Sequence, residues 1–105
     1  MLILISRDTA TQRTFADYCK IENFEFTIIE NIEGLLQNKN IIRRSFIIID
    51  WENVKYKEVM ADLICHKWFL NVVTIGCNEN GFKSVSDLNT ALSIARYEIM
   101  QQHKF

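Results

Sequence analysis

Asp50 is the residue of this chain best placed to do chemistry. It ends the uninterrupted apolar run Phe46–Ile49, and such a run is typical of a strand buried on both faces of a parallel sheet. Functional groups of α/β proteins gather at the carboxyl ends of their strands. Together with Asp8, which follows the first apolar run, Asp50 could form a carboxylate dyad for acid–base catalysis. A capping role for Asp8 is the simpler interpretation, because a helical pattern follows it directly.

The other reactive side chains give weaker indications of a functional site. Cys77 follows the last apolar run and is the thiol whose reactivity we would test, because a parallel sheet places it near Asp50. Cys65 and His66 are adjacent, so they point to different faces of a helix, and no other cysteine lies at metal-ligand spacing. The turn Ser6–Thr11 contains no glycine, whereas loops that cradle phosphates depend on glycines. We therefore expect no metal, no cofactor and no enzymatic activity.

The elements that would position these residues alternate along the chain. Four apolar runs predict strands at Leu2–Ile5, Phe24–Ile29, Phe46–Ile49 and Leu70–Ile75. Helical spacing follows each run and predicts helices after Asp8 or Thr9, after Asn31, from Tyr56 to Lys67, and after the capping-box sequence Ser84–Asp87. This alternation predicts an α/β fold, a small doubly wound parallel sheet of order 2-1-3-4 with helices on both faces.

Composition indicates the class of protein. The 105 residues suit a single domain, 1–105, and a hydrophobic share of 49% favours a folded chain. A net charge of −1 argues against capture of nucleic acid or an anionic membrane by the domain as a whole. No apolar stretch reaches membrane-spanning length, and the three cysteines form no disulfide framework. We expect a cytoplasmic protein with reduced thiols.

The segment Phe46–Asn53 resembles the part of response-regulator receiver domains that carries their phosphoacceptor aspartate. The resemblance runs from Met1 to about Cys77 and rests mainly on the order and lengths of the elements. It implies a flavodoxin-like fold in which Asp50 stands at the acceptor position.

Other receiver positions are replaced. Where the family holds a divalent cation with an acidic pair after the first strand, this chain has Ser6 and Arg7. A hard cation needs oxygen ligands, and phosphoryl transfer depends on its charge. Gly76 stands where the family has Ser or Thr, and Lys83, the nearest match to the family's lysine, follows after only seven positions. The resemblance therefore implies a pseudo-receiver with a degenerate phosphorylation site and a shortened C-terminal end.

Asp50 would need a partner if it were buried, because an isolated buried carboxylate is costly. Arg7 lies at the neighbouring strand end, so we predict an Arg7–Asp50 pair in the space where receivers bind their cation. The residues expected to line this strand-end pocket are Ser6, Arg7, Asp8, Gly76, Cys77 and Lys83.

The last predicted helix and Trp51 are candidates for an interface. Several apolar side chains lie off the main stripe of the helix, and receivers commonly dimerise in this region. Trp51 is either a partly exposed interface anchor or part of the core rim. The expected interface residues are Leu88, Leu92, Ile94, Tyr97, Met100 and Trp51.

These features predict a non-catalytic signalling module that acts by protein–protein contact, as a homodimer or with a regulatory partner. The resemblance implies phosphorylation-independent transcription regulation, in which an attached or partner domain would bind DNA. The alternative is a small stand-alone inhibitor, such as an immunity protein, an antitoxin or a phage factor. A small enzyme using Asp50, Asp8 and Cys77 is disfavoured, because the chain lacks a glycine loop and a credible metal set.

Overall fold

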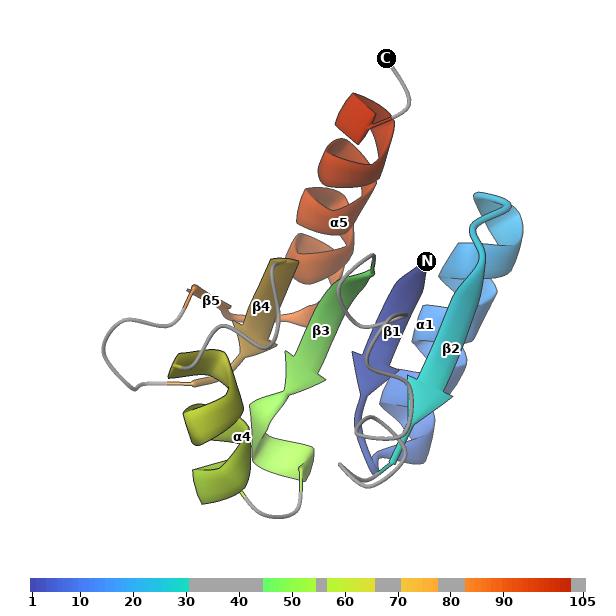
Figure 1. The fold of residues 1–105 in the computed structure, drawn as a ribbon. Helices are drawn as coiled ribbons and strands as arrows, with labels where there is room; N and C mark the ends of the chain where they lie inside the picture. The colour runs from blue at the N-terminus through green and yellow to red at the C-terminus, as the bar shows by residue number, and fades with distance from the viewer. Residues whose placement is uncertain (31–44, 55–56, 66–70, 78–82, 103–105) are drawn as a thin grey trace.

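The computed structural model describes residues 1–30, 45–54, 57–65, 71–77 and 83–102. In chain order the elements are β1 (Leu2–Ile5), α1 (Thr9–Ile21), β2 (Phe26–Ile29), β3 (Phe46–Asp50), the short 3-10 helix η1 (Trp51–Asn53), α4 (Lys57–Cys65), β4 (Asn71–Ile75), β5 (Ser84–Val85) and α5 (Leu88–Gln102). Strands form at the four predicted apolar runs, and helices follow β1, β3 and β5 (Figure 1). The helix predicted after Asn31 lies outside the described residues. None of the helices described is both long and apolar enough to cross a membrane.

The described strands form one parallel sheet of order β2-β1-β3-β4-β5. The prediction of an α/β fold with a parallel sheet is confirmed. The observed order differs from the predicted 2-1-3-4 by β5, which adds to the edge beside β4. β1 and β3 are neighbours, with Ile5 opposite Ile49, so the residues that follow these two positions meet at the carboxyl edge of the sheet.

β5 is a strand of two residues, Ser84–Val85, at the edge of the sheet. Its Val85 carbonyl accepts a hydrogen bond from the Gly76 N–H at 2.9 Å, which extends the ladder with β4. Only the eight positions 76–83 connect the two strands, whereas a parallel connection usually takes about a dozen or more. A strand of two residues is too short to leave an alternating pattern in the sequence, which is why the predicted order lacks it.

The final helix begins at Leu88, and its cap differs from the predicted one. Ser84 belongs to β5 instead of opening a capping box. The Asp87 carboxylate caps α5, because its Oδ1 accepts from both the N–H and the hydroxyl of Thr90 at 2.8 Å. Asp87, the last residue of the predicted capping-box sequence, is therefore the N-cap of α5.

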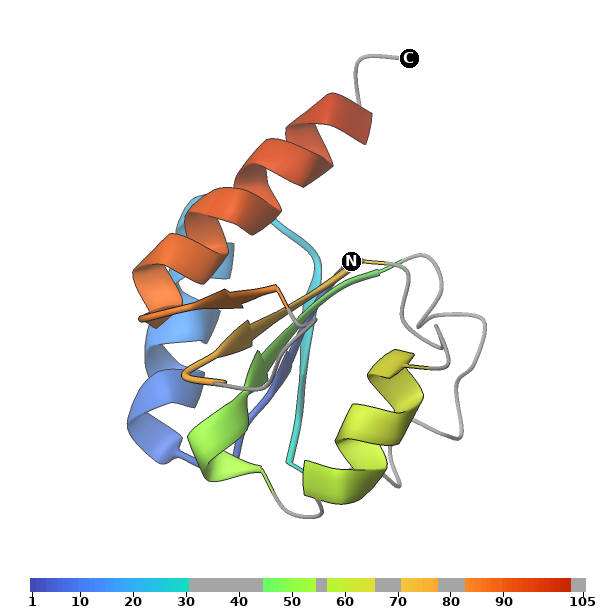
Figure 2. The same cartoon turned by 90° about the vertical axis from the view of Figure 1, so that its left-hand side faces the viewer.

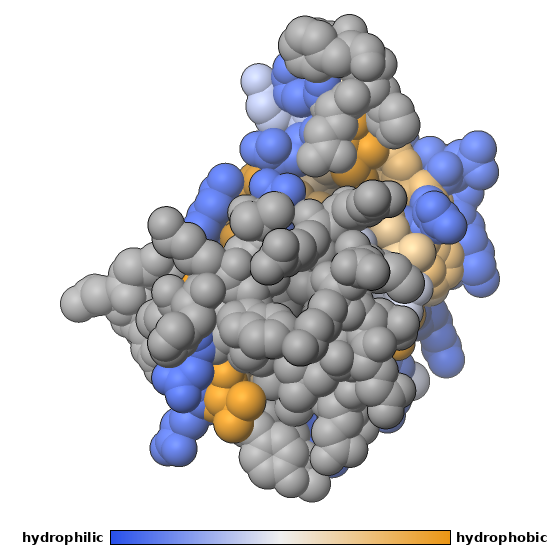
Figure 3. Space-filling view, in the orientation of Figure 1, coloured by the Kyte–Doolittle hydropathy of each residue, from blue (hydrophilic) through white to orange (hydrophobic). Residues whose placement is uncertain are grey.

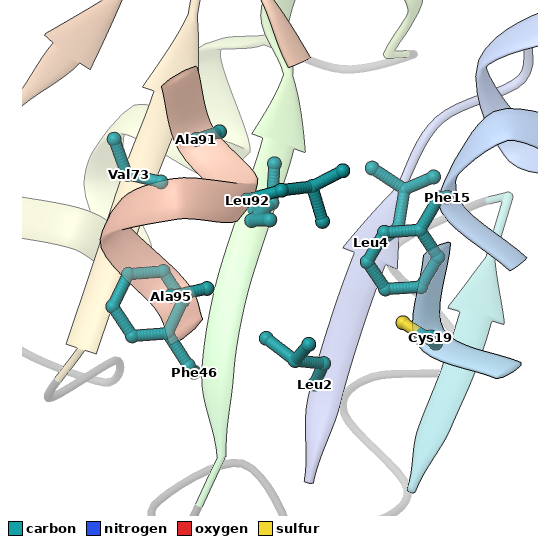
Figure 4. Packing of buried hydrophobic residues seen from close by; sticks show 10 residues of the cluster. Leu2, Leu4, Phe15, Cys19, Phe46, Val73, Ala91, Leu92 and Ala95 are labelled. Atoms are coloured by element: carbon teal, nitrogen blue, oxygen red, sulfur yellow. The ribbon is translucent and has the colours of Figure 1, made fainter. Parts of the chain in front are cut away.

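Helices cover both faces of the sheet, as predicted, and Figure 2 shows α1 and α5 on one side with α4 on the other. Successive side chains of a strand point to opposite faces, so two apolar cores result. On one face, Leu4 packs with Phe15 of α1 and Leu92 of α5 (Figure 4). On the other face, Ile5 belongs to the cluster that contains Met60 of α4.

Leu92→Ala should lower the free energy of unfolding by about 2–5 kcal/mol, because truncating a buried leucine leaves a cavity between α5 and the sheet. Val59→Ala on α4 is the control, because that side chain is 44% exposed and its loss should change stability by no more than about 0.5 kcal/mol. Urea denaturation followed by circular dichroism measures both variants. Equal losses in the two variants would contradict the packing of α5.

Candidate functional site

Two neighbouring strand ends bring Ser6 and Asp50 together. Ser6 follows β1, and Asp50 is the last residue of the adjacent β3. The Ser6 hydroxyl donates to Asp50 Oδ2 at 2.9 Å, and the side-chain amide of Asn53 donates to the same oxygen at 2.9 Å. Asp50 is only 6% exposed. Hydrogen bonds to a carboxylate are stronger than neutral ones, so the two donors offset the cost of its burial.

Further hydrogen bonds join the segment after β1 to η1. The Arg7 N–H donates to the Asn53 carbonyl at 3.0 Å, and the Asp8 N–H donates to Ser6 Oγ at 3.1 Å. The Ser6 hydroxyl is thus a donor to Asp50 and an acceptor from Asp8, which uses both of its hydrogen-bonding functions. The two segments therefore hold one another with Asp50 between them.

The predicted Arg7–Asp50 pair is wrong. The Arg7 side chain is exposed, and no ion pair joins it to Asp50, although the structure describes both residues. Successive side chains of an extended chain point in opposite directions, so a backbone that directs Ser6 toward Asp50 directs Arg7 away. The neutral groups of Ser6 and Asn53 supply the partners that burial requires.

Asp8 caps α1, which confirms the simpler of its two interpretations. Its Oδ2 accepts from the Thr11 N–H at 2.9 Å and from the Thr11 hydroxyl at 2.6 Å. These bonds, the hydroxyl's more than the backbone's, hold the pKa of Asp8 below its usual value. A carboxylate held at a helix terminus in this way is poorly placed to exchange protons with Asp50, so the geometry does not favour a catalytic dyad.

Gly76 and Cys77 lie where β4 leaves the sheet. Gly76 has a φ of +76°, in the left-handed region that glycine adopts without steric cost. A Cβ at this position would lie 3.4 Å from Oε1 of Glu52, so the Glu52 side chain occupies the space beside the glycine. Cys77 is 6% exposed and belongs to the apolar cluster that contains Trp51. Burial in this apolar cluster favours a packing role for the thiol.

Lys83 contributes to this edge through its backbone. Its carbonyl accepts from the Thr74 N–H at 2.9 Å and from the Thr74 hydroxyl at 3.2 Å, while its side chain is exposed. No hydrogen bond or ion pair between Lys83 and Asp50 occurs in the described part of the chain. Of the predicted pocket residues, Ser6 is the one whose side chain binds Asp50.

Burial corrects two of the predicted interface residues. Trp51 is 6% exposed and packs in the cluster on the α4 face, which favours its core-rim interpretation. Leu92 is 1% exposed and packs in the cluster on the opposite face. Trp51 follows β3 directly, whereas Leu92 packs onto the sheet from α5, and both side chains belong to the core. Leu88 and Ile94 are partly buried against the same cluster as Leu92.

Tyr97 and Met100 remain as exposed apolar residues on α5. Their exposed fractions are 63% and 49%. Figures 1 and 2 show this part of the helix extending past the sheet, away from the edge that carries Asp50. In Figure 3, apolar surface is visible beside hydrophilic surface in the upper region where α5 runs. The candidate interface and the strand-end cluster thus lie at opposite ends of the molecule.

Asn53 is the residue of the cluster to which sequence reasoning assigned no role. It lies three positions after Asp50, at the end of η1. A 3-10 helix has about three residues per turn, so it places Asn53 on the same side of the chain as Asp50. An amide three positions after a strand-end carboxylate is the sequence signal that would have predicted the hydrogen bond.

The interpretation of the Ser6–Asp50–Asn53 cluster rests on its geometry, because the chain matches no protein-family model, no curated protein and no solved structure. Within the described ranges, no group of three or more His, Cys, Asp or Glu side chains is arranged to hold a metal ion. In this cluster two neutral donors bind one oxygen of a buried carboxylate, and their hydrogen bonds connect the ends of β1 and β3 with η1.

Ser6→Ala should lower the free energy of unfolding by about 1–3 kcal/mol, because the buried Asp50 carboxylate loses one of two donors to the same oxygen. Arg7→Ala is the adjacent control; its exposed side chain predicts a change of no more than about 0.5 kcal/mol. Urea denaturation of both variants gives the comparison. A greater loss from Arg7→Ala would show that the guanidinium, and not the hydroxyl, supports Asp50.

The stabilisation that the Asp8 charge provides should disappear in acid. The pKa of Asp8 in the folded chain lies below the unperturbed value of 3.8, so the contribution is complete above 3.8 and is lost as the pH falls through the folded pKa. Asp8→Asn keeps a good capping side chain without the charge. Melting temperatures of the two chains should therefore differ at neutral pH and converge in strong acid. A gap that stays constant with pH would contradict the assignment.

Proposed function

We propose that this chain is a non-catalytic, receiver-like regulatory module that acts by contact with other proteins. The strand order β2-β1-β3-β4-β5 is the order of flavodoxin-like folds. In addition, Asp50 ends the central strand of the sheet, as the resemblance of Phe46–Asn53 to receiver domains implies. These two features support the finer assignment of the fold.

The hydrogen-bonding of Asp50 is the observation that carries the proposal. Receiver domains use an acidic pair after the first strand to hold a cation beside the acceptor carboxylate. Here the first of those positions is Ser6, whose hydroxyl is bonded directly to Asp50 at 2.9 Å. The second is Arg7, whose side chain is exposed. Two neutral donors therefore bind one oxygen of Asp50, and neither of the two positions carries an acidic side chain, which favours a structural carboxylate over a phosphoacceptor.

Regulation of such a module would depend on its partners. Phosphoryl transfer relies on a metal ion to neutralise the charge of the phosphoryl group, and the oxygen ligands for that ion are replaced at Ser6 and Arg7. The module would then be regulated by its own concentration or by a protein that binds it. The resemblance to receivers points to transcription regulation, with DNA contacted by an attached or separate domain.

Incubation with acetyl phosphate and Mg²⁺ tests this proposal directly. Intact-mass spectrometry should show no phosphate adduct, because Asp50 is engaged by Ser6 and Asn53 instead of a cation site. Asp50→Asn is the matched control, since it removes the acceptor while keeping the size of the side chain. An adduct on the native chain that is missing from Asp50→Asn would overturn the proposal.

The exposed end of α5 is the surface that we propose for self-association. Tyr97 and Met100 are three positions apart, so they lie on the same side of the helix. Aromatic residues and methionine are enriched at protein interfaces. The ion pair between Arg96 and Glu22, at 3.4 Å, joins α5 to the end of α1 beside this surface. A second copy of the chain is the proposed partner.

Light scattering after size-exclusion chromatography tests the α5 surface. The native chain should show a mass that rises toward that of a dimer with concentration, and Tyr97→Ser should shift this transition to higher concentration. Val59→Ser on α4 is the control, because it also removes an exposed apolar side chain but lies on the opposite face of the sheet. A monomer at every concentration would contradict self-association and would favour the alternative of a stand-alone inhibitor.

A further inference from the structure

We draw no further inference here: the strongest candidate, the outer edge of β2 between the exposed residues Glu25 and Glu30, carries nothing because no described part of the chain shows what covers that edge.

Discussion

The hydrogen bond from Ser6 to Asp50 is the constraint on which the carboxyl edge of the sheet depends. Asp50 is buried at the end of the central strand, and a buried carboxylate without donors would oppose folding. Because Ser6 and Asn53 donate to the same oxygen, the ends of β1 and β3 and the turn of η1 take one mutual arrangement. The backbone hydrogen bond from Arg7 to Asn53 adds to it. The edge is thus held by internal polar contacts.

Local patterns explain which features could be predicted from the sequence. The runs that became β1 and β3 are apolar at nearly every position, and all of their residues are buried, so their type and their parallel pairing were evident. The start of α1 could be predicted to within one residue, Asp8 or Thr9, because the capping hydrogen bonds of Asp8 and Thr11 lie within one turn of chain. Each of these signals lies within a few consecutive residues.

Choices that depend on side-chain direction or on packing between distant elements could not be predicted. Ser6 and Arg7 were both candidates to contact Asp50. The direction of the backbone after β1 places the Ser6 side chain against Asp50 and the Arg7 side chain in solvent. Trp51 reads equally well as an anchor or a core residue until the α4 face is in place. β5 pairs with β4 over two residues, which is too little for any sequence pattern to reveal.

Gly76 limits how this strand end can change over evolutionary time. Its left-handed backbone would cost most other residues about 1–2 kcal/mol, although a Cβ there would meet Oε1 of Glu52 at an ordinary contact distance of 3.4 Å. A mutation that introduces a side-chain hydroxyl at this position is therefore disfavoured unless the turn is rebuilt first. Descendants of this chain are expected to retain the glycine while the exposed side chains around it diverge.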